Sequence, residues 1–415
     1  MSYLSATCPK IRPLDFQSVN HQGEQVWLVR DPHEITSAQL ILPPVLAQMT
    51  VYCDGLHDIP SIYAALERDL GGQIPQGVLE EALETLDEAC MLDNDRFQQK
   101  KDEVVAEFRQ AEFRPMTLAG LNYSQDLTEL AKQFAAYAID DDRAKIAEWD
   151  SWNGRGIVSP HIDYQRGGRA YAQTWARSKR AVAEADLVLM FATDHKGGLG
   201  SLTLTEKPYE TPYGILPTEV ELVQKLAKSI GKRDAYRLEL NHRKEHSVEL
   251  SAVWLHHIAH QVRPNNPPPM VPLLIGSFNH FVTGNGHPAQ DRQMMRFVET
   301  LQETTAGKRV LCVASVDLSH VGPAFGDDYV MDEAKRTALV EADSSLMDAV
   351  VAGDEERFYS EIAGMQDRNK VCGFSPLYLM LKFMGETTGT RIAYEHCPAD
   401  SEDESLVSIC GLLLN

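Results

Sequence analysis

Residues 186–198 read Asp-Leu-Val-Leu-Met-Phe-Ala-Thr-Asp-His-Lys-Gly-Gly, and their pattern decides the fold class. The short apolar run predicts a strand buried on both faces, and the polar residues after it predict a loop at the carboxyl end of that strand. Similar runs occur at residues 156–159, 270–275 and 309–314. Stretches with helical spacing of apolar residues alternate with them, at residues 171–185, 217–230, 247–261 and 289–304. This alternation predicts an α/β fold with a mixed or largely parallel sheet flanked by helices.

Three of the predicted strands lead into loops that carry both histidine and aspartate. These loops contain Pro160-His161-Ile162-Asp163, Asp194-His195 and Asp317-Leu318-Ser319-His320. Ligands of an open α/β sheet bind beyond the carboxyl ends of its strands, so these side chains should converge there. Because imidazole is the commonest metal ligand, the convergence predicts a metal or catalytic site, with Asp163, Asp194 and Ser319 in its pocket. A capping role is the alternative for each motif taken alone.

A fourth polar element, Glu245-His246-Ser247-Val248-Glu249, precedes a predicted helix. We expect Ser247 to cap this helix, which places His246 at the helix N-terminus. The helix dipole disfavours positive charge there, so the ring of His246 should stay neutral and able to act as a general base. The alternative is a plain capping segment.

Other candidate motifs carry less weight. His256 and His260 lie four residues apart, a spacing that can chelate a metal, but we expect them on a solvated helix face. Cys372 is a further candidate for the pocket; it precedes a predicted helix, whose N-terminus would lower the pKa of the thiol, but simple burial is the more common role of such a cysteine. The sequence contains no P-loop, no G-x-S-x-G elbow and no G-x-G-x-x-G dinucleotide fingerprint.

The first part of the chain is predicted to be a separate small module, residues 1–95. An apolar run at residues 26–29 predicts a strand, and helical patterns follow at residues 40–52, 58–70 and 75–91, an arrangement that suggests a winged-helix-like fold. Residues 1–100 carry 6 Lys and Arg against 15 Asp and Glu, so DNA binding is disfavoured. Residues 96–113 are predicted to be a helical connector, and residues 114–415 the α/β domain.

Charge and cysteine usage narrow the class of protein further. The 415-residue chain has 39 Lys and Arg against 60 Asp and Glu, a net charge of −21 that repels nucleic acids and anionic membranes. No apolar run reaches the roughly 18 residues that a membrane span requires. The 7 cysteines are scattered singly and no secretory signal is visible, which predicts reduced thiols in the cytoplasm.

The order of the motifs resembles the Memo family, whose bacterial and archaeal members are called AmmeMemoRadiSam system protein B. The resemblance rests on the following segments, in order: P-H-x-D-Y at residues 160–164, T-D-H-x-G at 193–197, E-H-S-V-E at 245–249, S-x-D-L-S-H-x-G at 315–322 and C-G-F-S-P at 372–376. Residues 114–123 look like the family's opening R-x-x-x-x-A-G-x-x-Y segment, and residues 405–411 like its closing strand, so the resemblance covers residues 112–415.

The N-terminal module has a resemblance of its own. The pattern G-x-x-V-W-L-V-x-D-P at residues 23–32, followed by Asp54-Gly55 and by Leu83 and Leu86, resembles PqqD-like domains. Such domains bind peptides or partner proteins. A structural cap on the larger domain is the alternative.

The Memo resemblance implies a fold similar to that of the class III extradiol dioxygenases, which carry non-haem iron. It implies that His161 and His195 are metal ligands and that His246 is the catalytic base. Fe(II) is the implied cofactor, with copper or zinc as alternatives. Well-known members place a cysteine ligand where this chain has Ser319, which leaves His320, Asp317 or Asp327 to supply the third contact.

Three functions remain open from the sequence. The first is a metal-dependent oxidoreductase acting on a small-molecule or peptide substrate, with His246 and Asp317 catalytic and with His161, His195 and His320 at the metal. The second is a non-enzymatic protein that binds a ligand or a partner through a degenerate metal site. The third is a metal-assisted hydrolase. The resemblance implies radical-SAM and AMMECR1-like partner proteins.

Overall fold

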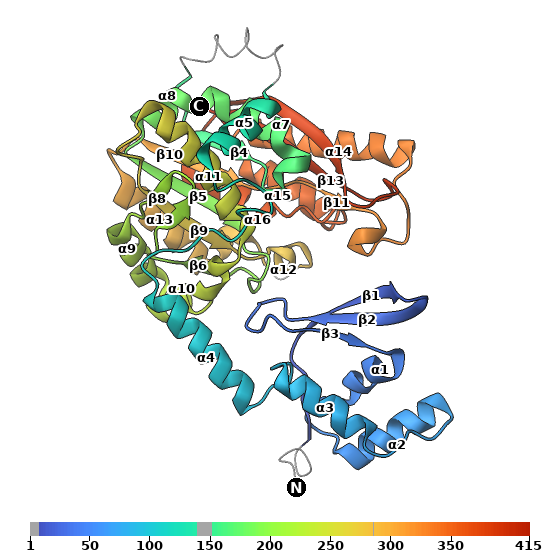
Figure 1. Cartoon of the computed structure of the whole chain (residues 1–415). Helices are drawn as coiled ribbons and strands as arrows, with labels where there is room; N and C mark the ends of the chain where they lie inside the picture. Colours follow the sequence, from blue (N-terminus) through green and yellow to red (C-terminus); the bar gives the residue numbers. More distant parts are fainter. Residues whose placement is uncertain (1–7, 139–151, 285) are drawn as a thin grey trace. The chain divides into compact units, whose positions relative to one another are not determined.

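The computed structural model describes residues 8–138, 152–284 and 286–415, and the chain divides into two compact units, residues 1–111 and 112–415 (Figure 1). Each unit has its own buried core. No helix in the described part of the chain is long and apolar enough to cross a membrane.

The first unit combines a three-stranded antiparallel sheet with four helices. The sheet has the order β1-β2-β3, with bounds Asp15–His21, Glu24–Arg30 and Gln39–Leu42. The helices are α1 (Pro44–Tyr52), α2 (Ile59–Leu70), α3 (Val78–Glu88) and α4 (Asp95–Gln110). The winged-helix-like arrangement of this unit stays a prediction.

Two strands of this unit were not predicted from the sequence. Strand β1 is mostly exposed and polar, so it lacks the apolar alternation that marks a half-buried strand. Residues 40–52, predicted to be one helix, are divided between the end of β3 and helix α1. The division falls at Pro43-Pro44, because Pro44 occupies the first helical position, where its missing N–H costs no hydrogen bond.

The second unit is built on an eight-stranded mixed sheet. Its strand order is β11-β13-β4-β10-β5-β9-β6, and β12 pairs with β13 at the side. Strands β4 (Gly156–Ser159), β10 (Val310–Ser315), β5 (Leu187–Thr193) and β9 (Met270–Ile275) are parallel. Their neighbours β13 (Leu406–Leu414) and β6 (Leu202–Leu204) run antiparallel to them. The predicted α/β class, with a mixed and largely parallel sheet flanked by helices, is confirmed.

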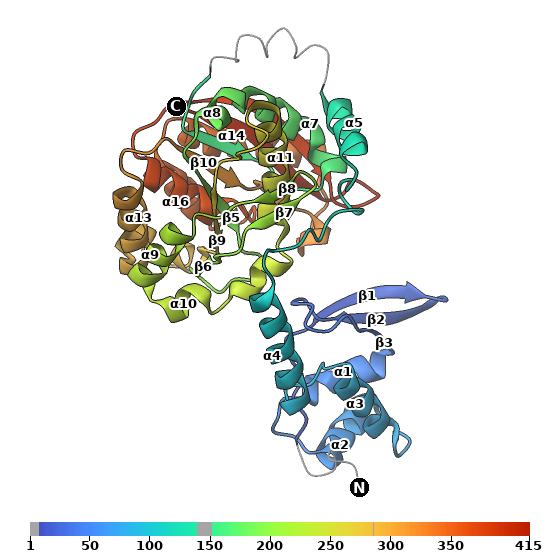
Figure 2. The same ribbon diagram turned by 60° about the vertical axis from the view of Figure 1, so that its left-hand side comes forward.

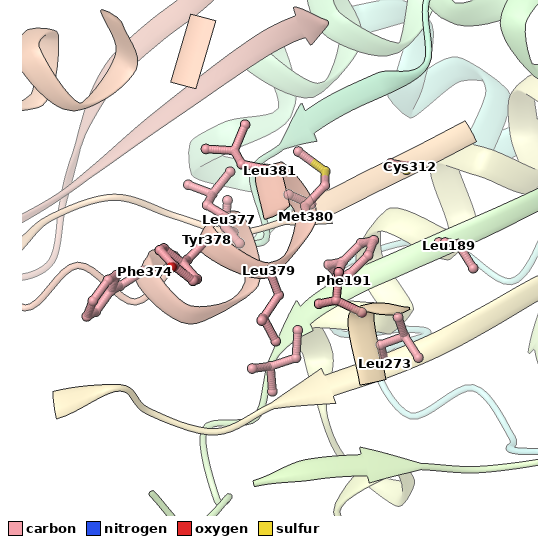
Figure 3. Packing of buried hydrophobic residues seen from close by; sticks show 14 of the residues in the cluster. Leu189, Phe191, Leu273, Cys312, Phe374, Leu377, Tyr378, Leu379, Met380 and Leu381 are labelled. Carbon is pink, nitrogen blue, oxygen red and sulfur yellow. The ribbon is translucent and has the colours of Figure 1, made fainter. Parts of the chain in front are cut away.

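Helices cover both faces of this sheet, as Figures 1 and 2 show. Helices α7 (Tyr164–Trp175), α8 (Lys179–Glu184) and α11 (His246–Val262) share one core with alternate residues of β5, Val188, Met190 and Ala192. Helices α9 (Val220–Ile230), α13 (Arg292–Thr305) and α16 (Phe374–Met384) share the other core with Leu187, Leu189 and Phe191. Figure 3 shows α16 side chains packed near Phe191 in this second core. A strand buried on both faces explains why its sequence is continuously apolar.

The remaining elements connect or flank those described above. They are α5 (Leu127–Tyr137), η2 (Ala176–Ser178), β7 (Tyr209–Thr211), β8 (Gly214–Leu216), α10 (Lys232–Tyr236), η3 (Glu239–Arg243), α12 (Asn279–Val282), η4 (Pro288–Gln290), β11 (His320–Val321), η5 (Pro323–Phe325), α14 (Glu333–Val351), α15 (Glu355–Gly364) and β12 (Gly389–Pro398). Helices α14 and α15 add side chains to the core of α16. The helix predicted at residues 171–185 is in fact α7, η2 and α8, with α7 beginning earlier, at Tyr164.

Candidate metal centre

His161 lies just beyond the end of β4 and is buried, with 1% of its surface exposed. Its Nδ1 lies 2.9 Å from the carbonyl oxygen of Ser315, the last residue of the neighbouring strand β10. A carbonyl oxygen can only accept, so Nδ1 carries the proton and Nε2 keeps its lone pair. Burial, with the charge of nearby His195, lowers the pKa of His161 to about 3. The ring is therefore neutral at physiological pH and presents an unprotonated nitrogen.

His195 follows strand β5, which lies on the other side of β10 from β4. The ring centroids of His195 and His161 are 5.0 Å apart. Nδ1 of His195 lies 2.9 Å from Oε1 of Glu245, and the backbone N–H of His195 donates to Oε2. Burial would lower the pKa of His195, but the hydrogen bond and the charge of Glu245 outweigh it and raise this pKa. The carboxylate thus holds the ring from its Nδ1 side and leaves Nε2 for a ligand.

Glu245 contacts two of the candidate histidines, and the sequence reasoning assigned it no role. It is the N-cap of α11, and its carboxylate accepts from the backbone N–H of Ser247. The prediction that Ser247 caps the helix is wrong, because the Ser247 hydroxyl donates to the carbonyl oxygen of Thr193. Oε1 of Glu245 also lies 3.2 Å from Nδ1 of His246, so one buried carboxylate contacts two histidines. Burial alone would raise the pKa of Glu245, but the two histidines hold it well below its usual range.

His246 opens helix α11 beside the other two histidines. Its ring stacks on His195 with centroids 4.6 Å apart and lies 5.1 Å from the ring of His161. Its side chain is 40% exposed, whereas that of Glu245 is buried. Desolvation lowers the pKa of His246 to about 3; the charge of Glu245 acts against this, and the charges of His195 and His161 act with it. The neutral ring expected from the helix dipole is thus favoured chiefly by desolvation of the ring atoms among their neighbours, although the side chain as a whole is 40% exposed.

Cys372 supplies a thiol to the same cluster, from the segment that precedes α16. Its Sγ lies 3.3 Å from Nε2 of His161 and 3.4 Å from the carbonyl oxygen of Asp317. Ligand atoms of His161, His195 and Cys372 all lie within 4.8 Å of one another. Of the two roles that the sequence left open for Cys372, burial is the one found, because it raises the pKa of this thiol well above its usual value.

Ser319 does not take part in this cluster. It is fully buried, and its hydroxyl donates to Oδ1 of Asp343 at 2.6 Å. A thiol reaches this cluster instead from Cys372, more than fifty residues further along the chain. The sequence contained this signal in the C-G-F-S-P motif, but nothing local indicated that it would meet His161.

The other proposed third ligands have different partners. Oδ1 of Asp317 accepts the backbone N–H groups of His161 and Ile162, and its Oδ2 lies 3.7 Å from Nε2 of His161. His320 has its Nδ1 3.2 Å from the carbonyl oxygen of Leu318. Among the described residues it belongs neither to the group above nor to a second group of converging ligand atoms, formed by His195, Glu245 and His246. Asp327 forms an ion pair with Lys370 at 2.5 Å.

Two of the predicted pocket aspartates have structural contacts. A cleft of about 250 Å³ opens beside His195 and Cys372. Asp163 caps α7 and forms an ion pair with Arg166, and it is not among the residues that line this cleft. Asp194 does line that cleft, and its carboxylate accepts from the side chains of Asn241 and Thr203. Burial raises the pKa of Asp194.

A buried arginine ties the turn that carries Glu245 to the start of the second unit. Arg114 is fully buried, and its guanidinium donates to the carbonyl oxygens of His242 and Glu245 at 2.9 and 3.1 Å. It also forms an ion pair with Glu249, one turn further along α11. Arg114 belongs to the motif at residues 114–123, and Glu245 and Glu249 belong to the motif at residues 245–249; both motifs were singled out from the sequence.

Glu249 is held from several directions at once. Its carboxylate accepts the backbone N–H groups of Thr117 and Leu118, at 3.0 and 2.9 Å, and the hydroxyl of Tyr123, at 2.5 Å. Burial would raise the pKa of Glu249, but the charge of Arg114 and these hydrogen bonds lower it. The network fixes the first turn of α11 and thereby the position of Glu245.

Helix α11 carries three further histidines, His256, His257 and His260. Among the described residues, none of them belongs to a group of side chains that could hold a metal ion. The prediction of a solvated face is wrong for His256, which is 3% exposed and has its Nδ1 2.7 Å from the Thr211 hydroxyl. His260 is exposed as predicted.

The cluster's donor atoms fit a transition metal. Two imidazoles and one thiol are borderline or soft ligands, which suit copper, zinc and iron rather than magnesium or calcium. The Nδ1 atoms of both histidines face partners outside the cluster. That of His161 faces the carbonyl oxygen of Ser315, and that of His195 faces the carboxylate of Glu245. Such contacts usually accompany metal-binding histidines, because they fix the tautomer and orient the ring.

An open α/β sheet with histidine and cysteine donors gathered at the carboxyl edge of its parallel strands defines a candidate metalloprotein. The family model described as Memo-like protein matches residues 114–413. The chain belongs to this family, and the resemblance stated from the motifs is confirmed.

Relatives in the family differ in how much of the chain they share. A MEMO1 family protein of Aquifex aeolicus is 24% identical over 411 residues, which cover 98% of this chain and 99% of that protein. One from Methanosarcina barkeri is 28% identical over 262 residues, covering 61% and 83% of the two chains. One from Thermus thermophilus is 23% identical over 339 residues, covering 78% and 89%. The similarity to the Aquifex protein therefore extends over both units.

Proposed function

We propose that this chain is a metal-dependent oxidoreductase whose ion, iron or copper, is held by His161, His195 and Cys372. The observation that carries the proposal is the convergence of these three donors within 4.8 Å, with both rings oriented by partners outside the cluster. When bound, such an ion would supply one-electron redox chemistry to a substrate in the adjacent cleft. Two of the donors, His195 and Cys372, line that cleft, so a substrate can approach them.

The remaining residues of the site have distinct proposed roles. His246 is partly exposed and unprotonated, so it can accept a proton from a bound substrate. Glu245 orients His195 and His246. Asp317 is a positioning residue, because its Oδ1 holds the backbone of the His161 loop. Radical-SAM and AMMECR1-like partners remain part of the proposal on the family resemblance alone.

Titration of metal-free protein, prepared without oxygen, with Fe(II), Cu(I) and Zn(II) tests the proposal. We expect one ion per chain, and we expect Cys372→Ser to weaken Cu(I) binding by at least about a hundredfold, because a hydroxyl is a far poorer ligand than a thiolate. Cys8→Ser removes an exposed thiol of the first unit and is the matched control. Equal affinity of both variants for Cu(I) would exclude Cys372 as a ligand. Binding of Zn(II) alone would favour a metal-assisted hydrolase instead.

A second prediction concerns the carboxylate that orients the rings. Glu245→Gln keeps the size of the side chain but removes its charge, and loss of such an outer contact typically weakens metal affinity by about 10–100-fold. We expect this loss in the same titration, without a change in the number of ions bound. Glu341→Gln, at an exposed position on α14, is the control. An affinity equal to that of the control would show that Glu245 does not orient the ligands.

A further inference from the structure

A cleft of about 250 Å³ opens beside the candidate metal ligands in the second unit. His195 and Cys372 form part of its lining, and Phe278, Val371 and Phe374 form an apolar wall. The rings of Phe278 and Phe374 meet edge to face, with centroids 5.6 Å apart. A small cleft with apolar walls and a few polar groups is the usual form of a small-molecule site.

Two charged side chains, Asp367 and Lys370, also line this cleft. Both come from a loop in which Gln366, Asp367 and Lys370 have φ values of 53°, 47° and 51°. Residues other than glycine rarely adopt this left-handed conformation, and such residues occur preferentially at functional sites. The same loop leads directly to Cys372, so the backbone that presents the two charges also presents the thiol.

The charges of the two side chains are not equally compensated. Nζ of Lys370 forms an ion pair with Asp327 at 2.5 Å, and Asp327 is also bound by the backbone N–H of Gly322. The carboxylate of Asp367 accepts only the backbone N–H of Val371, at 2.8 Å. Within the described ranges, no Lys, Arg or His nitrogen lies within 4.0 Å of it. Lys370 also acts on Asp367 through space and lowers its pKa, but its Nζ is paired with Asp327, so the charge left without an ion-pair partner in the cleft is negative.

A second acid of the cleft acts in the same direction. Asp194 lines the cleft as well, and its hydrogen-bond partners, Asn241 and Thr203, are neutral. Burial raises the pKa of Asp367 to about 6, which means that desolvation destabilises its ionised form. A cation beside the carboxylate would offset that cost, whereas an anion would add to it.

We propose that this cleft binds a small molecule with a primary ammonium group and an apolar or aromatic body. The ammonium pairs with the Asp367 carboxylate, and the body packs against Phe278 and Phe374. The proposal deepens the oxidoreductase assignment, on which the role of this ligand as substrate rests. Binding itself depends only on the cleft and is measurable without metal.

The test compares 2-phenylethylamine, which is cationic at neutral pH, with 2-phenylethanol, its uncharged analogue, by calorimetric titration of the metal-free full-length protein. We expect the amine to bind at least about tenfold more tightly than the alcohol, because a charge-assisted hydrogen bond is roughly twice as strong as a neutral one. Phenylacetate, an anion of similar size, is expected to bind more weakly than either. Equal binding of the amine and the alcohol, or no binding of the amine, would overturn the proposal.

The variant Asp367→Asn makes the test specific. Asparagine adopts the left-handed conformation readily and keeps an oxygen that accepts the Val371 N–H, so the loop should be preserved. We expect this variant to lose the preference for the amine. Asp328→Asn removes the same charge from an exposed neighbouring position and should keep the preference. A preference retained by Asp367→Asn would show that another group binds the ammonium.

The two proposals can fail separately. Metal titration of the wild-type protein tests the metal centre, and amine titration of the metal-free protein tests the cleft. Amine binding without metal binding would leave the cleft assignment intact and remove the oxidoreductase. Metal binding without amine binding would leave the proposed metal centre intact and remove the assignment of the cleft.

Discussion

Replacing Arg114 with methionine is expected to lower the free energy of unfolding of the second unit by about 3–5 kcal/mol. Methionine retains much of the apolar volume but removes the charge, so the buried carboxylate of Glu249 loses its ion-pair partner. The carbonyl oxygens of His242 and Glu245 lose their donors in the same step. Urea denaturation, followed by the fluorescence of the buried Trp175 and Trp254, measures the change.

The matched control is Arg169→Met, because the Arg169 side chain is 57% exposed and lies 3.9 Å from Glu395. Exposed ion pairs of this kind typically contribute about 0–1 kcal/mol. A similar loss in both variants would mean that Arg114 is not essential to the buried network. The double variant Arg114→Met with Glu249→Gln should lose less than the sum of the single losses, because the two residues share one interaction.

The same network predicts a pH dependence of stability. The pKa of Glu249 is lower in the folded protein than in the unfolded chain, where a glutamate has a pKa of about 4.3. The stabilisation is therefore present above that value and is lost as the pH falls through the folded pKa. The difference in unfolding free energy between wild type and Glu249→Gln should shrink below about pH 4.

The central sheet could be predicted from the sequence because its parallel strands are buried on both faces. Continuous apolar runs identify such strands, and residues 156–159 and 270–275 match β4 and β9 residue for residue. The strands that were not predicted are short, exposed or, like β12, only partly buried. β1 is polar on both faces, and β7 and β8 have three residues each, too few to show a period.

The candidate metal centre was predictable only in part. His161 and His195 follow predicted strands, so the topology of the sheet brought them together. Cys372 precedes a helix, and its contact with His161 depends on how α16 packs across β5 and β10, which local patterns do not encode. Glu245 was assigned no role because Ser247, a more common capping residue type, lies nearby.

Replacing His161 with alanine is expected to weaken metal binding by more than a hundredfold, a larger loss than the roughly 10–100-fold typical of residues that only support a ligand. His161 is buried, its Nδ1 is occupied by the carbonyl oxygen of Ser315, and its Nε2 faces the Cys372 thiol. Alanine removes the nitrogen from a set of only three donors. Elemental analysis of protein purified without oxygen, together with the Cu(I) titration, measures the loss.

Replacing His246 with alanine is expected to change metal affinity by less than about tenfold, because its Nδ1 faces Glu245 rather than the thiol. His246 and Glu245 nevertheless form a second group of converging ligand atoms with His195, so the comparison decides between two centres that share one histidine. His260→Ala, at an exposed position on the same helix, is the control for loss of an imidazole. If His246→Ala releases the ion as completely as His161→Ala does, the ion lies between His195, Glu245 and His246, and a proton acceptor for the substrate must be sought elsewhere in the cleft.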